Sequence, residues 1–406
     1  MVYERWGINK PAKEAEKSLA NGYDLLYGMK FEEAKAEYQK LVQKYPNSAE
    51  THLGLSMAIR YLDDRTRALV ECKKALELDP DAIGAQLNFA DLILPMRGAK
   101  VEPPISDSAR NAIGVEYCRK ALKSTHPLST YAHTTLFAIY LGGYGQLNNA
   151  RKELFELGKK AYFPKKLEDF AYNMLIGVAP DAVLFTNGDN DTYPLLALQE
   201  YQGMRKDVRV VNTSLLNIAK VAVLFRDSLK VPISFTNKEI ESIRPAKDKT
   251  TGKIILPAHV LIANIIANAR KQGIPVYFAV TLAPDNQGIF KDNLILEGLV
   301  WRVTNAVTKD SIDIDKVIDN MTNKFRLSNA TLKEEWSANL SPLTRNISGL
   351  VINYAACYNA MTQYYLNQGK KSEAVDYLKK SLPFFEFAGR EELAKETKQR
   401  IEEYSK

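Results

Sequence analysis

Asp189 and Asp191 are the side chains of this sequence that are best placed to do chemistry. They bracket Asn190 directly after the apolar run 182–185, and carboxylate oxygens are the ligands that hard divalent cations prefer. An Asp-x-Asp pair of this kind can hold a metal that bridges to the diphosphate of a nucleotide sugar. The alternative is structural: Asp189 accepts backbone hydrogen bonds in a turn, and Asp191 caps the next helix.

A short buried strand and a helix would position this pair. Residues 182–186 are apolar up to Thr186, which favours a strand of a parallel sheet covered on both faces. A turn and a helix over 193–201 follow. In open α/β sheets ligands bind where a strand end faces a helix N-terminus, so this turn is the predicted ligand site. The candidate ligand-binding residues are Asn187, Gly188, Asp189, Asn190, Asp191, Thr192, Asn212 and Thr213, with Asp189 and Asp191 as candidate metal ligands.

Polar residues also follow the other predicted strands. The strand 208–212 ends at Asn212 and Thr213, and residues 284–287 come soon after the strand 275–281. Strands that alternate with helices pair in parallel, so their carboxyl ends meet on one rim. A pocket is therefore expected there. Two further strands are predicted, one over 231–235 and one at the sheet edge within 296–304.

The sequence contains no recognisable catalytic motif. It has no G-x-S-x-G elbow, no H-E-x-x-H helix and no C-x-x-C pair. The four histidines are scattered, and the three cysteines each fall within a helical pattern, where they are expected as buried small side chains. No catalytic residue is assigned. No cofactor is expected beyond the divalent cation considered for Asp189 and Asp191.

Length and composition indicate a multidomain globular protein. A chain of 406 residues exceeds one ordinary domain, and 46% apolar with 25% charged residues permits an ample core. The net charge of +7 is mild and comes without a dense basic run, which argues against nucleic acid as a partner. The longest apolar stretch, 254–267, is too short to span a bilayer.

Residues 15–80 contain a tandem helical repeat. The segments 15–46 and 49–80 align residue by residue, and their closing prolines, Pro46 and Pro80, lie 34 residues apart, the tetratricopeptide period. Ala34 and Ala68 then fall where the two helices of each pair cross. The close approach at Gly22 in the first unit corresponds to Ser56 in the second.

Further helix pairs are predicted on both sides of the strands. A third unit (83–124) and a fourth (129–162) complete an N-terminal repeat domain, residues 1–163. An α/β domain follows over 164–308. Residues 309–406 form C-terminal helices with another tetratricopeptide-like pair, in which Ala374 lies at the crossing. The predicted fold class is therefore α/β plus α: a small three-layer parallel-sheet domain flanked by tetratricopeptide-like helix pairs.

The first helix of each tetratricopeptide pair normally lines a concave groove. Seven of the ten residues on that face are apolar or aromatic, and exposed apolar patches are rare unless they bind something. We therefore expect the groove to take an extended peptide or helix from another protein. The alternative is that other parts of the chain, the α/β domain or the C-terminal helices, fill it. The predicted groove residues are Glu16, Leu19, Tyr23, Leu26, Tyr27, Glu50, Leu53, Met57, Arg60 and Tyr61.

Four blocks of the α/β region resemble a known family. They are L-F-T-N-G-D-N-D-T-Y-P-L (184–195), the run 198–217, I-P-V-Y-F-A-V-T (274–281) and L-E-G-L-V-W-R-V (296–303). The resemblance, over roughly 165–305, is to the extracytoplasmic C-terminal region of polytopic membrane proteins of Bacteroidetes-like bacteria. Their animal relative is a transmembrane protein O-mannosyltransferase. The resemblance implies an α/β fold and an extracytoplasmic origin, but no transfer activity, since no membrane part is present in this sequence.

These observations lead to one expected function and two alternatives. The expected function is a non-catalytic interaction or scaffold protein that binds another protein through the tetratricopeptide groove, outside the cytoplasm after removal of a leader. A cytoplasmic location is the other option. The first alternative is an enzyme or accessory subunit of glycan assembly that binds a metal–nucleotide-sugar at 187–192. The second is a sensor whose α/β rim binds a metabolite.

Overall fold

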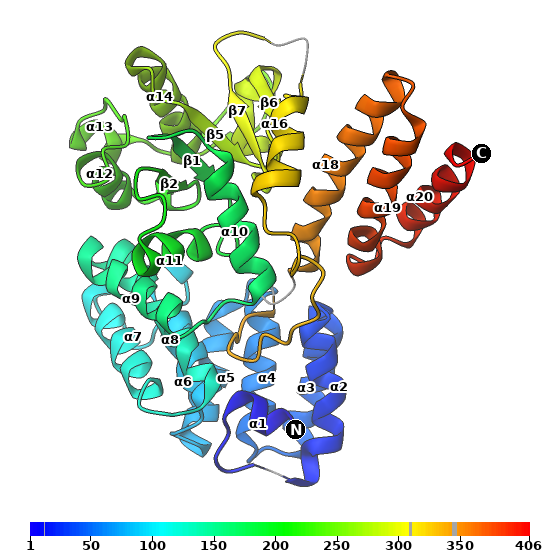
Figure 1. Ribbon diagram of the computed structural model, residues 1–406. Helices are drawn as coiled ribbons and strands as arrows, with labels where there is room; N and C mark the ends of the chain where they lie inside the picture. The colour runs from blue at the N-terminus through cyan, green and yellow to red at the C-terminus, as the bar shows by residue number, and fades with distance from the viewer. Residues whose placement is uncertain (12, 308–310, 343–346) are drawn as a thin grey trace. The chain divides into compact units, whose positions relative to one another are not determined.

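The structure is a computed structural model that describes residues 1–11, 13–307, 311–342 and 347–406. The chain divides into two compact units (Figure 1). Unit 1 comprises Met1–Tyr162 and Glu335–Asn346, and unit 2 comprises Phe163–Glu334 and Ile347–Lys406. The predicted domain boundary between 308 and 309 lies outside the described residues.

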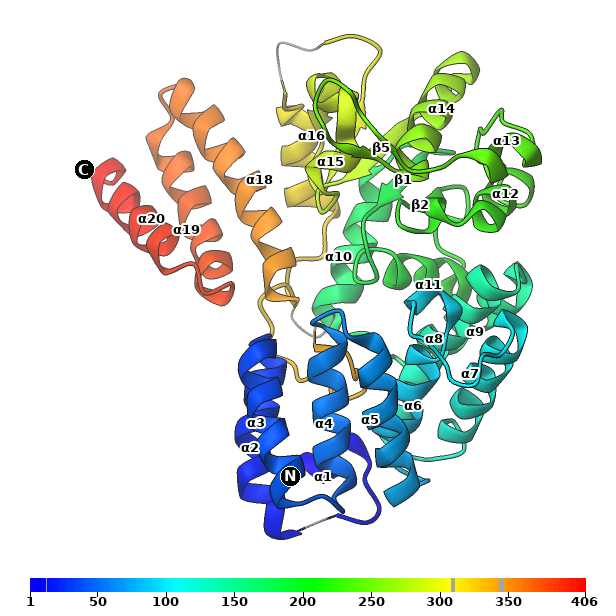
Figure 2. The ribbon, with the colours of Figure 1, turned by 180° about the vertical axis from the view of Figure 1, so that it is seen from behind.

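Unit 1 is helical. Its helices α2 to α5 pack in sequence order, side by side (Figure 2). The short helix α1 was not predicted. The helices of unit 1 are α1 (Val2–Trp6), α2 (Glu16–Tyr27), α3 (Phe31–Lys44), α4 (Ala49–Arg60), α5 (Arg65–Leu78), α6 (Ile83–Leu92), α7 (Asp107–Ala121), α8 (Ala132–Ala138) and α9 (Leu147–Lys159).

Side-chain caps fix where the second helix pair begins. The Ser48 hydroxyl accepts a hydrogen bond from the Thr51 N–H at 3.4 Å, and the Asp64 carboxylate accepts one from the Arg67 N–H at 3.1 Å. Each cap satisfies one of the free N–H groups at a helix start. Both helices of the second pair therefore begin at a side-chain cap, whereas α2 and α3 begin without one.

Small residues allow the helices of each pair to approach closely. Ala34 and Ala68 are fully buried at the predicted crossings. The ring of Tyr38 fills the space above two glycines: a Cβ added at Gly22 would lie 2.8 Å from it, and one added at Gly54 would lie 2.1 Å from it. The predicted close approach at Gly22 is therefore confirmed, and Gly54 is a second one that the sequence pattern did not reveal.

Unit 2 combines a sheet with helices that precede, connect and follow its strands. Its elements are α10 (Lys165–Gly177), β1 (Val183–Thr186), α11 (Tyr193–Gln202), β2 (Arg209–Asn212), α12 (Ala219–Asp227), α13 (Asn237–Ser242), β3 (Ala246–Lys247), β4 (Ile254–Ile255), α14 (Pro257–Gln272), β5 (Val276–Ala279), α15 (Pro284–Gln287), β6 (Leu294–Leu296), β7 (Val300–Val303), α16 (Ile314–Asp319), α18 (Ser348–Asn367), α19 (Lys371–Phe387) and α20 (Glu391–Tyr404).

The main sheet is mixed, so the prediction of a parallel sheet is wrong in part. Its order is β2-β1-β5-β7-β6, with β1 parallel to β2 and β5, and β7 antiparallel to β5 and β6. Only residues 297–299 join β6 to β7, and so short a connection permits only an antiparallel hairpin. The predicted strand within 296–304 is β7, an inner strand rather than the edge.

The stretch 231–235 is not a strand, contrary to the prediction. Val231 and Ile233 are buried, which explains the apolar pattern, but Pro232 lies between them and cannot donate to a sheet. A small hairpin follows, in which Ala246–Lys247 pairs antiparallel with Ile254–Ile255.

The C-terminal helices share one core with the sheet. The Asn173 amide on α10 donates to the Tyr354 hydroxyl on α18 at 2.8 Å, and its oxygen accepts from the Arg326 N–H at 2.7 Å. Ala374, at the predicted crossing of α18 and α19, is fully buried. The three-layer order stays a prediction. Within the described residues, no helix combines the length and apolar character that a membrane span requires.

Two glycine substitutions test the packing in unit 1. Gly54→Ala should lower the free energy of unfolding by about 1–3 kcal/mol, because the new methyl group overlaps the Tyr38 ring. The matched control is Gly349→Ala in α18, where the added Cβ meets nothing within 4 Å and should be neutral or stabilising by up to about 1 kcal/mol. Urea denaturation measures both. Equal effects of the two substitutions would show that overlap with the Tyr38 ring does not determine the stability of Gly54→Ala.

Candidate functional site

The rim at the carboxyl ends of β1, β2 and β5 is the first candidate site. Its central group is Asp191, whose side chain is buried. The carboxylate accepts hydrogen bonds from the Asn187 N–H at 2.8 Å and the Gly188 N–H at 2.7 Å, and a third from the Thr281 hydroxyl. Asp191 thus folds back onto its own turn and ties it to the chain after β5.

Burial dominates the ionisation of this carboxyl. Loss of hydration raises the pKa of Asp191, and the hydrogen bonds from Thr281 and the two backbone N–H groups oppose that effect only in part. A carboxylate that already accepts three hydrogen bonds inside the protein has most of its oxygen lone pairs occupied. To bind a cation, Asp191 would have to give up contacts that hold the turn together.

Thr192 and Asn212 join the turn to the neighbouring strand. The Thr192 hydroxyl lies 2.7 Å from the Thr186 hydroxyl and accepts from the Asn212 amide at 2.9 Å. The Thr213 hydroxyl donates to the Thr186 carbonyl at 3.1 Å. Six of the predicted ligand-binding residues therefore contact one another across β1 and β2: Asn187, Gly188, Asp191, Thr192, Asn212 and Thr213.

A longer chain of hydrogen bonds reaches the rim through His259, a residue to which the sequence assigned an ordinary role. The Leu256 N–H donates to Nδ1 of His259, so the ring proton is on Nε2, which lies 3.2 Å from the Asn286 side-chain oxygen. The Asn286 amide in turn donates to the Thr213 hydroxyl at 3.3 Å. His259 is the third residue of α14, the position from which a side chain in a capping box accepts from the backbone N–H of the N-cap residue, here Leu256. That position could have indicated the hydrogen bond between Leu256 and His259.

The two candidate metal ligands differ in their surroundings. Asp189 is exposed, whereas Asp191 is buried. In the described part of the chain, no three His, Cys, Asp or Glu side chains gather in a way that could hold a metal ion. The predicted structural roles also need correction, because Asp191 closes the turn. The N-cap of α11 is Thr192, which makes no side-chain cap.

Replacing Asp191 by asparagine tests whether its carboxylate closes the turn. At neutral pH Asp191→Asn should lower the free energy of unfolding by about 1–3 kcal/mol, because an amide NH₂ then faces a backbone N–H. Since the pKa of Asp191 is raised by folding, wild type should also lose stability as pH rises from the ordinary aspartate pKa towards the raised value. The variant should lack that decrease.

Urea denaturation across a pH series measures both effects, with Asp189→Asn as the matched control. Asp189 is exposed, so its substitution should change stability by less than the substitution at position 191. If Asp191→Asn were as stable as wild type throughout the pH series, the carboxylate would not be closing the turn.

The concave face of the first two repeats is the second candidate site, and in the structure it is not an open groove. Six of the ten predicted groove residues are buried and four are half-buried. The buried ones are Leu19, Tyr23, Leu26, Glu50, Leu53 and Met57, and the half-buried ones are Glu16, Tyr27, Arg60 and Tyr61. The expectation of an accessible face is therefore wrong for this structure.

Neighbouring parts of unit 1 use the polar members of this set. One Glu16 oxygen accepts from the Val2 N–H at 2.7 Å, which attaches α1 to α2. Glu50 accepts from the Ser48 hydroxyl at 2.7 Å. Arg60 forms an ion pair with the buried Asp91 on α6. These three charges stabilise the repeat array itself.

The returning segment Glu335–Ser341 covers the aromatic members. The Tyr27 hydroxyl donates to the Leu340 carbonyl at 3.0 Å, and the Tyr61 and Ser341 hydroxyls lie 3.1 Å apart. The Leu340 side chain is 2% exposed and belongs to the same core as α1 to α7. Within unit 1, α1 and this segment thus cover the predicted groove.

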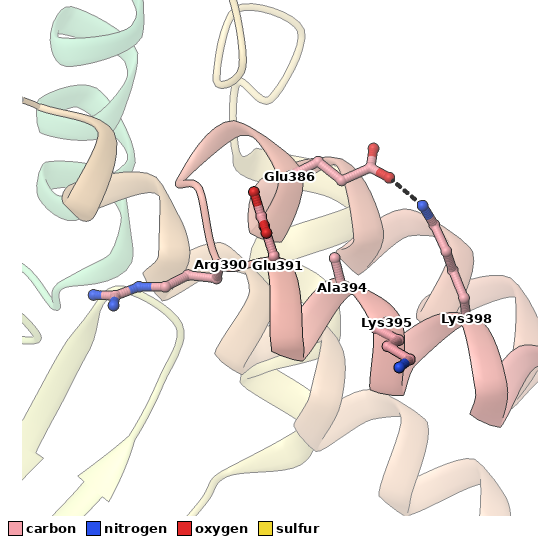
Figure 3. Close-up of a pocket in the computed structure, with 6 residues that line it drawn as sticks. All are labelled: Glu386, Arg390, Glu391, Ala394, Lys395 and Lys398. Atoms are coloured by element: carbon pink, nitrogen blue, oxygen red, sulfur yellow. Dashed lines mark ion pairs between the residues drawn. The ribbon is translucent and has the colours of Figure 1, made fainter.

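A hollow of about 510 Å³ lies between the end of α19 and α20 in unit 2 and was not predicted. Figure 3 shows Glu386 and Lys398 paired across it, at 2.8 Å, while Arg390 points away. Its lining combines two carboxylates (Glu386 and Glu391) with three cationic side chains and Ala394.

Two stretches match known families. Residues 24–48, from α2 through α3, match the tetratricopeptide repeat. Residues 167–249, from α10 through β3, match TMEM260-associated domain 2. The tetratricopeptide prediction is confirmed for residues 24–48, and residues 167–249 of the α/β region are similar to a TMEM260-associated domain.

Comparison with solved structures finds two structures of IFIT1. The first is a monomeric mutant with m7Gppp-AAAA, which is 14% identical in sequence to this chain and has a TM-score of 0.34. The match covers 96% of this chain and 71% of that chain. A second, with Gppp-AAAA, has 13% identity and a TM-score of 0.31 over the same shares. No curated protein matches the chain.

Proposed function

We propose that this protein is a non-catalytic interaction scaffold whose tetratricopeptide face binds an extended peptide of another protein. The observation that carries the proposal is the way this face holds the segment Glu335–Ser341. Tyr27 donates to a backbone carbonyl and Tyr61 contacts a serine hydroxyl, while Leu340 enters an apolar site. Backbone contacts combined with one buried apolar anchor are how grooves recognise extended peptides.

The repeat architecture supports this function. Tetratricopeptide arrays present a continuous surface made of successive helix pairs, and proteins built from them commonly mediate protein interactions. Tyrosine and arginine, which are enriched at binding hot spots, occur at Tyr23, Tyr27, Arg60 and Tyr61. We also propose an extracytoplasmic location, on the similarity of residues 167–249 to a TMEM260-associated domain.

A pull-down coupled to cross-linking tests the scaffold proposal. Wild type and a Tyr23→Ala, Tyr27→Ala, Tyr61→Ala triple variant, checked for folding by circular dichroism, are incubated with native extract and then cross-linked. We expect at least one protein to be retained by wild type, lost with the variant and cross-linked to α2 or α4. The cross-linked stretch, made as a synthetic peptide, should bind wild type.

The matched control is Lys35→Ala on α3, which lies outside the predicted concave set. Lys35→Ala should retain the same proteins as wild type. The proposal fails if wild type and the triple variant retain identical sets of proteins, because the concave face would then contribute nothing to binding.

The second candidate function is an accessory subunit of glycan assembly, related to the O-mannosyltransferase family, that binds a metal–nucleotide-sugar at residues 187–192. The similarity to a TMEM260-associated domain favours it. Calorimetric titration with Mn²⁺ and Mg²⁺, with and without nucleotide sugars, separates the two functions. This candidate is supported if wild type releases or absorbs heat on binding and the double variant Asp189→Asn, Asp191→Asn does not. It is eliminated if wild type gives no heat of binding at millimolar metal.

A further inference from the structure

The segment Glu335–Ser341, called the strap below, is held in unit 1 by contacts of its side chains and of the Leu340 carbonyl. Leu340 is buried in the core, and Trp336 packs against Tyr162 with ring centroids 5.3 Å apart. Hydrogen bonds from Tyr27 and at Tyr61 hold its C-terminal part. At its start, Glu335 forms an ion pair with Arg5 at 3.2 Å.

The strap has no helix or strand of its own. Its described backbone contains one turn at Ser337–Ala338, closed by a bond from the Asn339 N–H to the Trp336 carbonyl at 3.2 Å. It therefore gains nothing from a ladder of backbone hydrogen bonds, unlike the helices it covers. Segments held mainly by a few side-chain anchors open at lower free energy than the elements beneath them.

The path of the chain is consistent with a reversible contact. Unit 1 is otherwise complete at Tyr162, and the chain returns to it at Glu335 only after the strands of unit 2. Both ends of the strap continue into unit 2. A released strap would stay tethered close to its groove, so rebinding would be intramolecular and favoured by a high effective concentration.

We propose that the strap is a built-in ligand that closes the concave face of unit 1. A peptide of the same chemistry, an aromatic residue followed four positions later by leucine with a turn between them, replaces it. The proposal rests on the proposed function in taking this face as the partner site, and it adds the chemistry of the partner and the competition that controls access. Trp336 and Leu340 supply the two anchors, and both are buried.

A strap-weakened protein tests the competition. Trp336→Ala with Leu340→Ala removes both anchors, while Ser337→Ala changes an exposed residue of the strap and is the matched control. The probe is a fluorescent synthetic peptide of residues 333–342, and binding is followed by anisotropy. We expect it to bind the double variant at least about ten-fold more tightly than wild type or Ser337→Ala, because tethered competitors weaken binding in trans.

The hydroxyl groups of the groove should matter to the same peptide. Tyr27→Phe with Tyr61→Phe, added to the double variant, should weaken peptide binding roughly ten-fold, as expected for two lost hydrogen bonds. A peptide in which both anchors are alanine should not bind. The proposal is overturned if the original peptide binds wild type and the double variant equally tightly. It is also overturned if both proteins are folded and the peptide binds neither.

Hydrogen exchange on wild type keeps the proposal testable if the double variant does not fold. The N–H groups of Asn339 and Ser341 should exchange by local opening, at least about a hundred-fold faster than the protected N–H groups of α4. Exchange of strap and α4 at the same rate would make the strap a permanent part of the core and overturn the proposal.

Sedimentation separates intramolecular closure from exchange of straps between copies. Wild type should be monomeric, and a dimer that dissociates on addition of the 333–342 peptide would overturn closure within one chain. The competition experiment and the pull-down test different proposals. If the pull-down fails but the peptide competes with the strap as expected, the strap proposal is kept and the proposed function is lost. If the pull-down succeeds but the peptide does not compete, the proposed function is kept and the strap proposal is lost.

Discussion

The structure of unit 1 depends on the need to bury the apolar inner face of its first two repeats. Helix pairs that cross at Ala34 and Ala68 necessarily turn a row of leucine, methionine and tyrosine side chains to the same side. Leaving such a row in water would forfeit roughly 25 cal/mol for each Å² of apolar surface. Two segments far apart in the sequence cover it, α1 through Trp6 and the returning segment through Leu340. Neither α1 nor the returning segment belongs to the repeats, but both bury the apolar face that the repeats create.

The same reasoning applies to the rim of unit 2, with polar groups in place of apolar ones. Three strands end side by side, and the backbone there has no further ladder partners. A buried carboxylate placed among free N–H groups satisfies them, although burial raises its pKa. Asp191 satisfies the N–H groups of Asn187 and Gly188, while Thr192, Asn212 and Asn286 join the side chains of the rim to one another. A ligand of Asp191 would therefore have to replace existing hydrogen bonds.

Local patterns predicted the parts of this fold that local physics determines. The 34-residue period, the buried alanines and the apolar strands β1, β2 and β5 were all visible in the sequence, because each reflects spacing within one element. What failed depended on partners distant in the chain. The apolar run at 231–235 packs without joining the sheet because of Pro232, and β7 lies inside the sheet because a short hairpin adds β6 beyond it. The role of Asp191 was misassigned because its third partner, Thr281, is 90 residues away.

The predicted groove is a more instructive case. A stripe of apolar side chains shows that a surface requires a cover, but it contains no information on whether the cover is another molecule or the same chain. Segment 335–341 offered no periodicity, and therefore no pattern marked it as an occupant, although Trp336 and Leu340 are four residues apart. Covering by the same chain and binding by a partner also need not exclude each other. A cover without a ladder of backbone hydrogen bonds buries the face and can still open locally, which leaves room for another peptide to compete for the same contacts.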